Sequence, residues 1–289
     1  MQAHDHDGGS IRAEPGFLKE LADFWLTRVP SVYLRVEQKR GWLSWDRRVY
    51  LSIIRPGDAI LDIGANVGGH TALFSHLAGR TGKVIAYEPV PTNLRRLRDN
   101  VARRCRYDNV EIRDLAVGGA GARGRVKIIV PAGDATQASL QPHASGSWAD
   151  ARPEPFECGI TNLDADILSR RDVHVALMKI DVEGAELEVL RGAHDLLLRD
   201  EPLVYCEVFD EWTRAFLYEP ADLIEFMRAL DYTEARVFRD DGFARHSLGA
   251  LSALDIFGVS TNVLFAKGKH AQRLSVLDRH FGTVVNSSR

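Results

Sequence analysis

The chain contains little cysteine. It has three cysteines in 289 residues, and Cys105, Cys158 and Cys206 stand far apart without C-x-x-C spacing. A small, odd and scattered set of thiols supports neither a disulfide framework nor a thiolate zinc site. We therefore expect a protein of a reducing compartment and assign it to the cytoplasm.

Long apolar runs and a strong excess of charge are also absent. No window approaches the roughly 18 consecutive apolar residues of a membrane span, and the first ten residues include no apolar segment typical of a signal peptide. The formal net charge is only -3, so a broad cationic surface for nucleic acid is not expected. The sequence thus predicts neither a membrane nor a nucleic-acid partner.

The composition, 45% hydrophobic and 27% charged, is enough for one substantial core. Apolar residues at helical spacing in 16–29 predict an amphipathic cap helix, and 32–50 reads as short strands or turns. We divide the chain into an N-terminal tail and cap segment (1–55), a main domain (56–268) and a polar C-terminal tail with a short helical piece (269–289).

Strands and helices alternate from residue 56 onwards, which is typical of an α/β protein with a parallel, doubly wound sheet. The last two predicted strands follow each other without a helix, so the closing strand should run antiparallel. The predicted strands are 59–63, 83–87, 110–113, 175–180, 203–208, 232–238 and 262–266, and the predicted helices are 67–77, 91–104, 163–168, 185–198 and 220–230.

One insertion, residues 118–160, interrupts this alternation. It begins with several glycines, continues with an apolar strand and ends in a long polar stretch, so we predict a β-rich insertion made of a strand pair and a long loop. Loops longer than about 15 residues in a compact domain are usually functional or disordered. We predict a lid on the substrate side that carries Ser139 and His143; a disordered excursion is the alternative for 144–155.

The first motif is a strand, a glycine-bearing turn at 64–68 and a helix, followed by a second strand that ends in Glu88. A carboxylate in that place accepts hydrogen bonds from the ribose of an adenosine-bearing cofactor. Asn66 holds the place of the glycine that lets a pyrophosphate approach, and Asp62 would repel a phosphate but attract an ammonium or sulfonium group. Both features favour S-adenosyl-L-methionine over NAD.

The second motif is the segment 179–186, KIDVEGAE. Strand alternation would put Lys179, Asp181 and Glu183 on one face. In a functional interpretation one acid is the general base for a hydroxyl group; in a structural one, Lys179 and Asp181 form a salt bridge and Glu183 is a charge at a helix N-terminus. An oxygen-ligated Mg²⁺ held with Glu207 is a further alternative, but we predict no metal.

Together, residues 62–68, Glu88 and the more specific KIDVEGAE segment resemble FkbM-type S-adenosylmethionine-dependent methyltransferases. The resemblance covers roughly residues 56–267. It implies a class I methyltransferase (Rossmann-like) fold with a seven-stranded, mostly parallel sheet and an antiparallel last strand. For the activity, it implies methylation of hydroxyl groups on natural products or sugars.

The predicted site follows from the polar residues at the strand ends. Glu88 is assigned to the ribose, Asp62 to the methionine end of the cofactor, and residues 114–116 to the adenine ring. The catalytic candidates are Asp181, Glu183, Lys179 and Glu207; the cofactor-binding candidates are Asp62, Gly64, Ala65, Asn66, Gly68, His70, Thr71, Glu88, Pro89, Asp114, Leu115, Ala116 and Asp181; the substrate candidates are Ser139 and His246.

The sequence therefore predicts an S-adenosylmethionine-dependent O-methyltransferase that acts on a hydroxyl group of a small molecule with an aspartate or glutamate base. A non-catalytic cofactor-binding or scaffold module is one alternative, because fold does not determine function. An NAD-linked oxidoreductase is a second, which Asn66 and Asp62 disfavour. Assembly into a homo-oligomer is left open.

Overall fold

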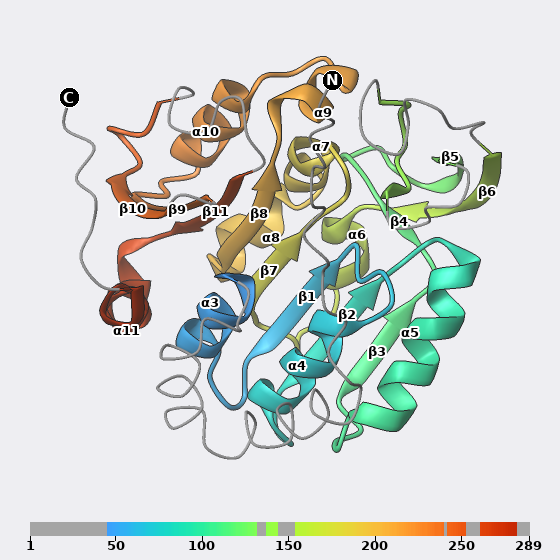
Figure 1. Cartoon of the computed structure of the whole chain (residues 1–289), viewed down its shortest axis with the longest axis horizontal. Coiled ribbons are helices and arrows are strands. Elements are labelled where there is room, and N and C mark those ends of the chain that lie inside the picture. The colour runs from blue at the N-terminus through green and yellow to red at the C-terminus, as the bar shows by residue number, and fades with distance from the viewer. Residues whose placement is uncertain (1–44, 132–136, 144–153, 240–241, 253–260, 282–289) are drawn as a thin grey trace, which may run out of the picture. The chain divides into compact units, whose positions relative to one another are not determined.

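A mixed sheet of eight strands lies at the centre of the computed structural model (Figure 1), which describes residues 45–131, 137–143, 154–239, 242–252 and 261–281. The strands are β1 (Ala59–Ile63), β2 (Lys83–Tyr87), β3 (Val110–Arg113), β7 (Val175–Ile180), β8 (Leu203–Val208), β9 (Glu234–Arg239), β10 (Gly242–Ser247) and β11 (Thr261–Ala266). Their order is β10-β9-β11-β8-β7-β1-β2-β3. All seven predicted strands are present, and β10 adds an eighth at one edge.

The pairing of the strands confirms a mostly parallel α/β sheet. β1, β2, β3, β7 and β8 pair in parallel, whereas the closing strand β11 is antiparallel to both of its neighbours, β8 and β9. Parallel strands covered on both faces are expected to be continuously apolar, and all five residues of β1 are buried although one of them is Asp62. An acid in such a strand needs a buried partner.

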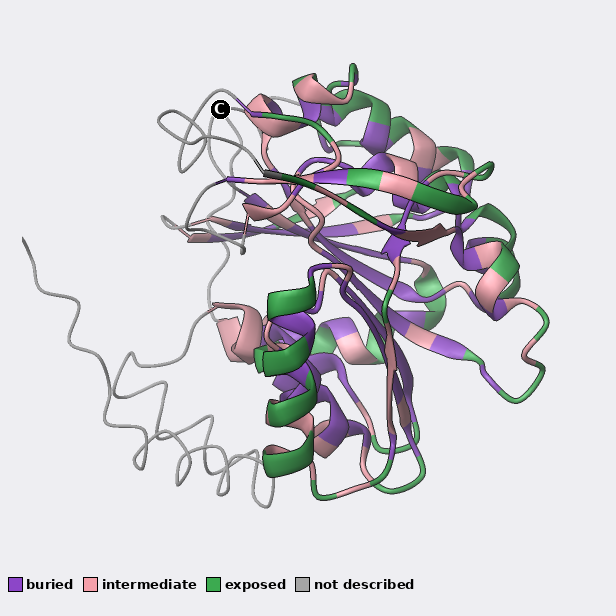
Figure 2. Cartoon of the chain, turned by 90° about the vertical axis from the view of Figure 1, so that its right-hand side faces the viewer, coloured by how far each residue is buried: buried purple, intermediate pink, exposed green. Residues whose placement is uncertain are grey.

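Helices cover both faces of the sheet (Figure 2). α6 (Leu163–Ile167), α7 (Glu186–Arg191), α8 (His194–Asp200) and α10 (Pro220–Ala229) contribute to one large core cluster. A second group of helices comprises α3 (Trp45–Ile53), α4 (Gly69–Ala78), α5 (Pro91–Arg104) and α11 (Ala271–Phe281). In this group α3 packs against both α11 and α4, and α4 packs against α5. The short helix α9 (Asp210–Ala215) follows β8. In the part of the chain that the structure describes, no helix combines the length and the hydropathy needed to cross a bilayer.

The predicted helix 185–198 is in fact two helices, α7 and α8, which meet at Gly192. A Cβ atom on Gly192 would lie 2.1 Å from the carbonyl oxygen of Gly118, so the start of the insertion packs directly on the backbone there. The spacing of hydrophobic residues in the sequence does not reveal this break between α7 and α8, because both helices bury leucines in the same core cluster.

Both ends of the described chain depart from the sequence-based boundaries. Residues 45–50, which we predicted to be strand or turn, belong to helix α3. The short helical piece that we predicted in the C-terminal tail is the 11-residue helix α11. The rings of Trp45 and Phe281 stack at 5.3 Å, and Arg236 donates two hydrogen bonds to Asp278 of α11. These helices are thus part of the fold. The predicted cap helix at 16–29 lies outside the described residues.

The insertion forms a second sheet beyond the carboxyl end of β3 (Figure 1). β5 (Gly124–Val130) pairs antiparallel with β6 (Glu154–Thr161), as the predicted strand pair requires, and the short β4 (Ala116–Val117) adds to β6. Ser139 forms a β-bridge with Ile129. Most of 144–155, for which we left a disordered excursion open, lies outside the described residues.

Candidate active site

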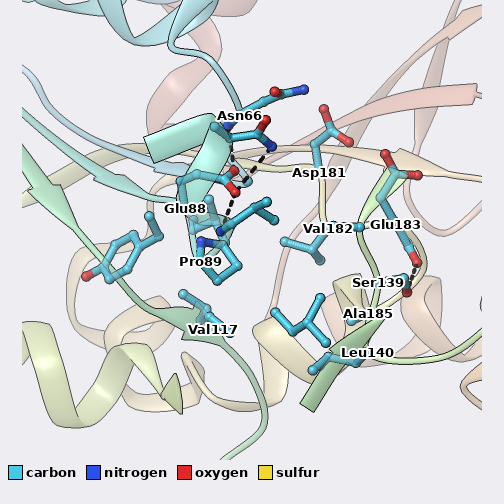
Figure 3. A pocket seen from close by; sticks show the side chains of 18 of the residues that line it. Asn66, Glu88, Pro89, Val117, Ser139, Leu140, Asp181, Val182, Glu183 and Ala185 are labelled. Atoms are coloured by element: carbon cyan, nitrogen blue, oxygen red, sulfur yellow. Dashed lines mark hydrogen bonds between the residues drawn. The ribbon is translucent and has the colours of Figure 1, made fainter. Parts of the chain in front are cut away.

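A pocket lies where the carboxyl ends of β1, β2, β7 and β8 meet the second sheet (Figure 3). In an open parallel sheet this is the edge at which ligands bind. Ten of the residues proposed from sequence line it, namely Gly64, Asn66, Glu88, Pro89, Leu115, Ala116, Ser139, Asp181, Glu183 and Glu207.

The other lining residues are mostly apolar, and sequence analysis did not identify them. Several come from the insertion, and no local pattern tells which face of that segment meets the main sheet. They are Ile63, Tyr87, Val90, Asn93, Val117, Ile128, Ala138, Leu140, Val182 and Ala185.

The turn after β1 is shaped by close backbone contacts. Gly64 has φ +77°, and a Cβ atom there would lie 1.8 Å from the carbonyl oxygen of Asp181. No other residue fits such a place. Asn66 also has a left-handed backbone, with φ 52°, and its buried Oδ1 has no hydrogen-bond partner among the described residues. A buried acceptor without a partner costs free energy, so the Asn66 amide is suited to a donor group on a ligand.

Glu88 joins this turn to the end of β2. Its carboxylate accepts hydrogen bonds from the backbone N–H groups of Asn66 and Val90, each at 2.8 Å. Burial raises the pKa of Glu88 to about 7, although these backbone hydrogen bonds act in the opposite direction. The acid is thus held in place at the pocket wall by the backbone on both sides of it.

Asp62 and Lys179 form a buried charged group below the pocket. The Nζ of Lys179 lies 2.8 Å from the Gly64 carbonyl oxygen, 3.1 Å from Asp181 Oδ2 and 3.7 Å from Asp62 Oδ1. Thr71 donates a 2.6 Å hydrogen bond to the other Asp62 oxygen. Burial acts against the charge of Lys179, but Asp181 and Asp62 together keep its pKa above the usual value. Asp62 and Lys179 therefore support the pocket from beneath and are not part of its wall.

The acidic motif forms a turn, contrary to the strand alternation that we expected. β7 ends at Ile180, and Glu183 and Gly184 have φ values of 58° and 100°. Such strain in a residue other than glycine points to a functional constraint. The carboxyl groups of Asp181 and Glu183 both face the pocket (Figure 3).

Glu183 is the most perturbed acid of the pocket. Its Oε2 is buried without a hydrogen-bond partner in the described part of the chain. Burial, followed by the charges of Asp181 and Glu207, raises the pKa of Glu183 to about 10. Asp181, by contrast, is paired with Lys179 and its side chain is 38% exposed. The two acids of the motif thus have different environments.

Glu186, which we did not propose from sequence, holds the turn in shape. Its Oε1 accepts hydrogen bonds from the backbone N–H groups of Val182 and Gly184, both at 3.2 Å. Its Oε2 lies 3.3 Å from the hydroxyl of Tyr218, which donates at 2.9 Å to the Gly184 carbonyl oxygen. Burial raises the pKa of Glu186 to about 7.

We expect Glu186→Gln to make the protein more stable at pH 8. A glutamate whose pKa is raised from 4.5 to about 7 on folding binds more protons in the folded state between these values, so its contribution to stability is lost as pH rises through that window. Glutamine keeps the accepting oxygen and does not ionise. The gain in unfolding free energy at pH 8 should be about 1–3 kcal/mol, measured by urea denaturation.

The same comparison at pH 4 is the control, because glutamate is then protonated in both states. The two proteins should have similar stability there. A glutamine variant that is less stable than the wild type at pH 8 would show that the ionised form of Glu186 is the one that stabilises the turn.

Several predicted residues lie away from the pocket wall. Asp114 is exposed, with its carboxylate 3.9 Å from Arg98, and His70 packs against the rings of Tyr50 and Phe74. Ala65 and Gly68 belong to the turn after β1 but do not line the pocket. His246, a substrate candidate from sequence, lies on β10, the edge strand that pairs with β9, and does not line the pocket.

The described residues contain no group of three histidine, cysteine, aspartate or glutamate side chains arranged to hold a metal ion. The alternative that Asp181, Glu183 and Glu207 together bind Mg²⁺ therefore has no matching geometry in this part of the chain.

Comparison with protein families gives one extended match. Residues 62–234 match the family described as methyltransferase FkbM domain, which is more than half of the 289 residues. The match begins at Asp62 and includes the turn after β1, Glu88, the insertion and the acidic motif.

Two curated relatives have shorter matches. The 31-O-demethyl-FK506 methyltransferase FkbM of Streptomyces tacrolimicus is 31% identical over 169 residues, which cover 49% of this chain and 62% of the relative. Protein-L-isoaspartate O-methyltransferase 2 of Archaeoglobus fulgidus is 35% identical over 74 residues, which cover 26% of this chain and 32% of the relative. The chain thus spans less than two thirds of either relative.

Among solved structures, methyltransferase FkbM from Methylobacillus flagellatus KT aligns with a TM-score of 0.44 and 17% identity. The alignment covers 86% of this chain and 60% of the other.

Proposed function

The chain belongs to the FkbM methyltransferase family, and from this we propose that it transfers the methyl group of S-adenosylmethionine to a hydroxyl oxygen of a small molecule. The observation that carries the proposal is the pocket at the strand ends, in which Glu88, Asn66, Asp181 and Glu183 surround one cavity. Both curated relatives are named as methyltransferases, and each name gives an oxygen atom as the site of methylation.

The pocket residues fit this cofactor. Glu88 ends the second strand of the turn motif, where a carboxylate binds the two ribose hydroxyls. The buried Asn66 Oδ1, which has no hydrogen-bond partner in the described part of the chain, is an acceptor for a hydroxyl or ammonium group. Asp181, which lines the pocket, supplies negative charge for a sulfonium. When bound, the cofactor supplies an electrophilic methyl group.

Methyl transfer from a sulfonium is a displacement in line with the bond that breaks, so the protein needs no covalent nucleophile. It must hold the acceptor oxygen in line with the methyl group, an effect of orientation that provides about 7–11 kcal/mol. It must also remove the proton of the hydroxyl group, for which a general base contributes about 10²–10⁴-fold.

Glu183 is the base that we propose, and Asp181 beside it is paired with Lys179 at 3.1 Å. The raised pKa of Glu183, about 10, means that it binds a proton strongly and can take one from a hydroxyl once it is ionised. A sulfonium nearby lowers that pKa because opposite charge favours the ionised form. In its ionised form Glu183 would take the proton of the acceptor hydroxyl group.

The alternatives are less consistent with the pocket. The side chain of Asn66 lines it, at the place that a pyrophosphate of NAD would approach. A module that binds the cofactor without catalysis has no need for a strained, buried Glu183 beside Asp181.

Calorimetric titration with S-adenosylmethionine and S-adenosylhomocysteine tests the proposal. We expect the wild type to bind both ligands. Glu88→Ala should bind them at least about tenfold more weakly, because the hydrogen bonds of the carboxyl group are lost. Asp114→Ala, at an exposed position, should bind like the wild type. Tight binding of NADH, or absence of binding by a folded wild type, would contradict the proposed function.

A further inference from the structure

The turn that follows β7, residues 181–184, is called the acidic turn below. Side chains hold four of its backbone polar groups. Glu186 accepts from the N–H groups of Val182 and Gly184, and Tyr218 donates to the Gly184 carbonyl oxygen. Both come from elements that follow the turn in sequence. The fourth group, the carbonyl oxygen of Glu183 itself, is held from another part of the protein.

That contact comes from the insertion. The hydroxyl of Ser139 donates a 2.9 Å hydrogen bond to the Glu183 carbonyl oxygen, and Ser139 is only 2% exposed. Its own backbone is fixed to β5 by two hydrogen bonds with Ile129, of 2.8 and 3.0 Å. The hydroxyl group of Ser139 thus connects the second sheet to the acidic turn.

A second contact joins the same segment to the helix behind the turn. The ring of His143 stacks on Trp212 of α9, with centroids 5.2 Å apart and planes at 29°. The Trp212 carbonyl oxygen would lie 2.8 Å from a Cβ atom on Gly184, so α9 packs directly behind the turn. Residues 137–143 therefore hold the turn both at Glu183 and through α9.

Such fixation matters because of the conformation of Glu183. A glutamate at φ 58° is strained and persists only when its surroundings determine it. The hydrogen bond from Ser139 is one of the contacts that fix this backbone, so its loss lets Glu183 relax from its strained conformation and shift its carboxyl group toward water. The buried position of that carboxyl group thus depends on the insertion.

We propose that Ser139 is a positioning residue whose hydroxyl group fixes the backbone of Glu183 and so holds the Glu183 carboxyl group in the pocket. This refines the proposed function: Ser139, which the sequence suggested as a substrate contact, acts on the base. Its hydroxyl hydrogen is used in the bond to Glu183 and is not available to an acceptor molecule.

The test is a ¹³C NMR titration of glutamate side-chain carboxyl groups in the full chain, without cofactor or acceptor. The Glu183 signal is identified as the one missing from Glu183→Gln. In Ser139→Ala we expect its titration midpoint to fall by about one pH unit or more, because a carboxyl group that reaches water returns toward its ordinary pKa. Ser139→Cys, which keeps the size but donates weakly, should lower it less.

Ser52→Ala is the matched control. Ser52 is also fully buried and donates a 2.7 Å hydrogen bond to a backbone carbonyl, that of Arg48, away from the pocket. It should leave the Glu183 midpoint unchanged. If both Ser139 variants are folded and titrate like the wild type, Ser139 does not position the base and the inference is wrong.

The NMR titration tests the positioning role of Ser139, and the calorimetry tests the proposed function, so either result can contradict its own proposal without the other. A wild type that does not bind S-adenosylmethionine contradicts the proposed function but leaves the effect of Ser139 on Glu183 measurable. Normal cofactor binding with an unmoved Glu183 midpoint contradicts only the positioning role.

Discussion

Glu183→Gln is expected to lower the turnover number by about 10²–10⁴-fold, the contribution of a general base, while S-adenosylmethionine still binds. Glutamine has nearly the shape of glutamate but cannot accept the hydroxyl proton. The measurement is the rate of S-adenosylhomocysteine release with a hydroxylated acceptor found by screening natural products and sugars. Wild-type turnover should rise with pH as Glu183 ionises, and the residual turnover of the variant should not follow that rise.

Two further variants make this result specific. Glu188→Gln is the same substitution on α7, five residues along the chain, at an acid that pairs with Arg191 outside the pocket; it should retain wild-type turnover. Asp181→Asn distinguishes the two acids of the motif. If Asp181→Asn lowers the turnover number by about 10²–10⁴-fold and Glu183→Gln does not, Asp181 is the base.

Lys179→Met should lower the free energy of unfolding by about 3–5 kcal/mol, the cost of removing one partner of a buried ion pair. Methionine fills similar space but leaves Asp62, 1% exposed, without its cation and the Gly64 carbonyl oxygen without its donor. The measurement is denaturation in urea at pH 7. The charge that is left unpaired lies directly under the turn after β1, so cofactor affinity should fall as well.

The double variant Lys179→Met, Asp62→Asn should recover part of this loss, because the uncompensated charge is then removed. Lys83→Met is the control: Lys83 is half-buried on β2 and pairs with Glu111 at 3.3 Å, so its loss should cost less than about 1 kcal/mol. A Lys179→Met protein as stable as the Lys83 variant would mean that the buried cation contributes little to the fold.

The sequence was sufficient for the sheet. Runs such as 59–63 and 203–208 are apolar apart from one acid each, Asp62 and Glu207. They are bounded by turn residues and alternate with amphipathic helices, and these local signals predicted the strands and the antiparallel last strand. It was less informative where local signals are weak. β10 is half-exposed and follows β9 through a tight connection, so its residues resemble a loop in composition.

The candidate site divides in the same way. Acids that follow strand ends, such as Glu88 and Asp181, were predictable because parallel strands bring their carboxyl ends to one edge. The partners of Asp62 were not, since its position just before the turn suggested only the pocket, whereas its carboxyl group lies beside Lys179 of β7 and accepts a hydrogen bond from Thr71 of α4. The sequence does not predict that Glu186 holds the turn, because an acid in the first turn of a helix is common.

The sequence by itself thus determined the order of most strands and helices, the turn after β1 and the acids at the sheet edge, because these depend on residues close together in the chain. Only the tertiary structure decided which acids are buried, which are paired and which residue holds Glu183. Ser139 and Glu183 are 44 positions apart, and their contact depends on how the second sheet packs on the first. Burial and charge pairing, which set the pKa values of the site, arise from that packing.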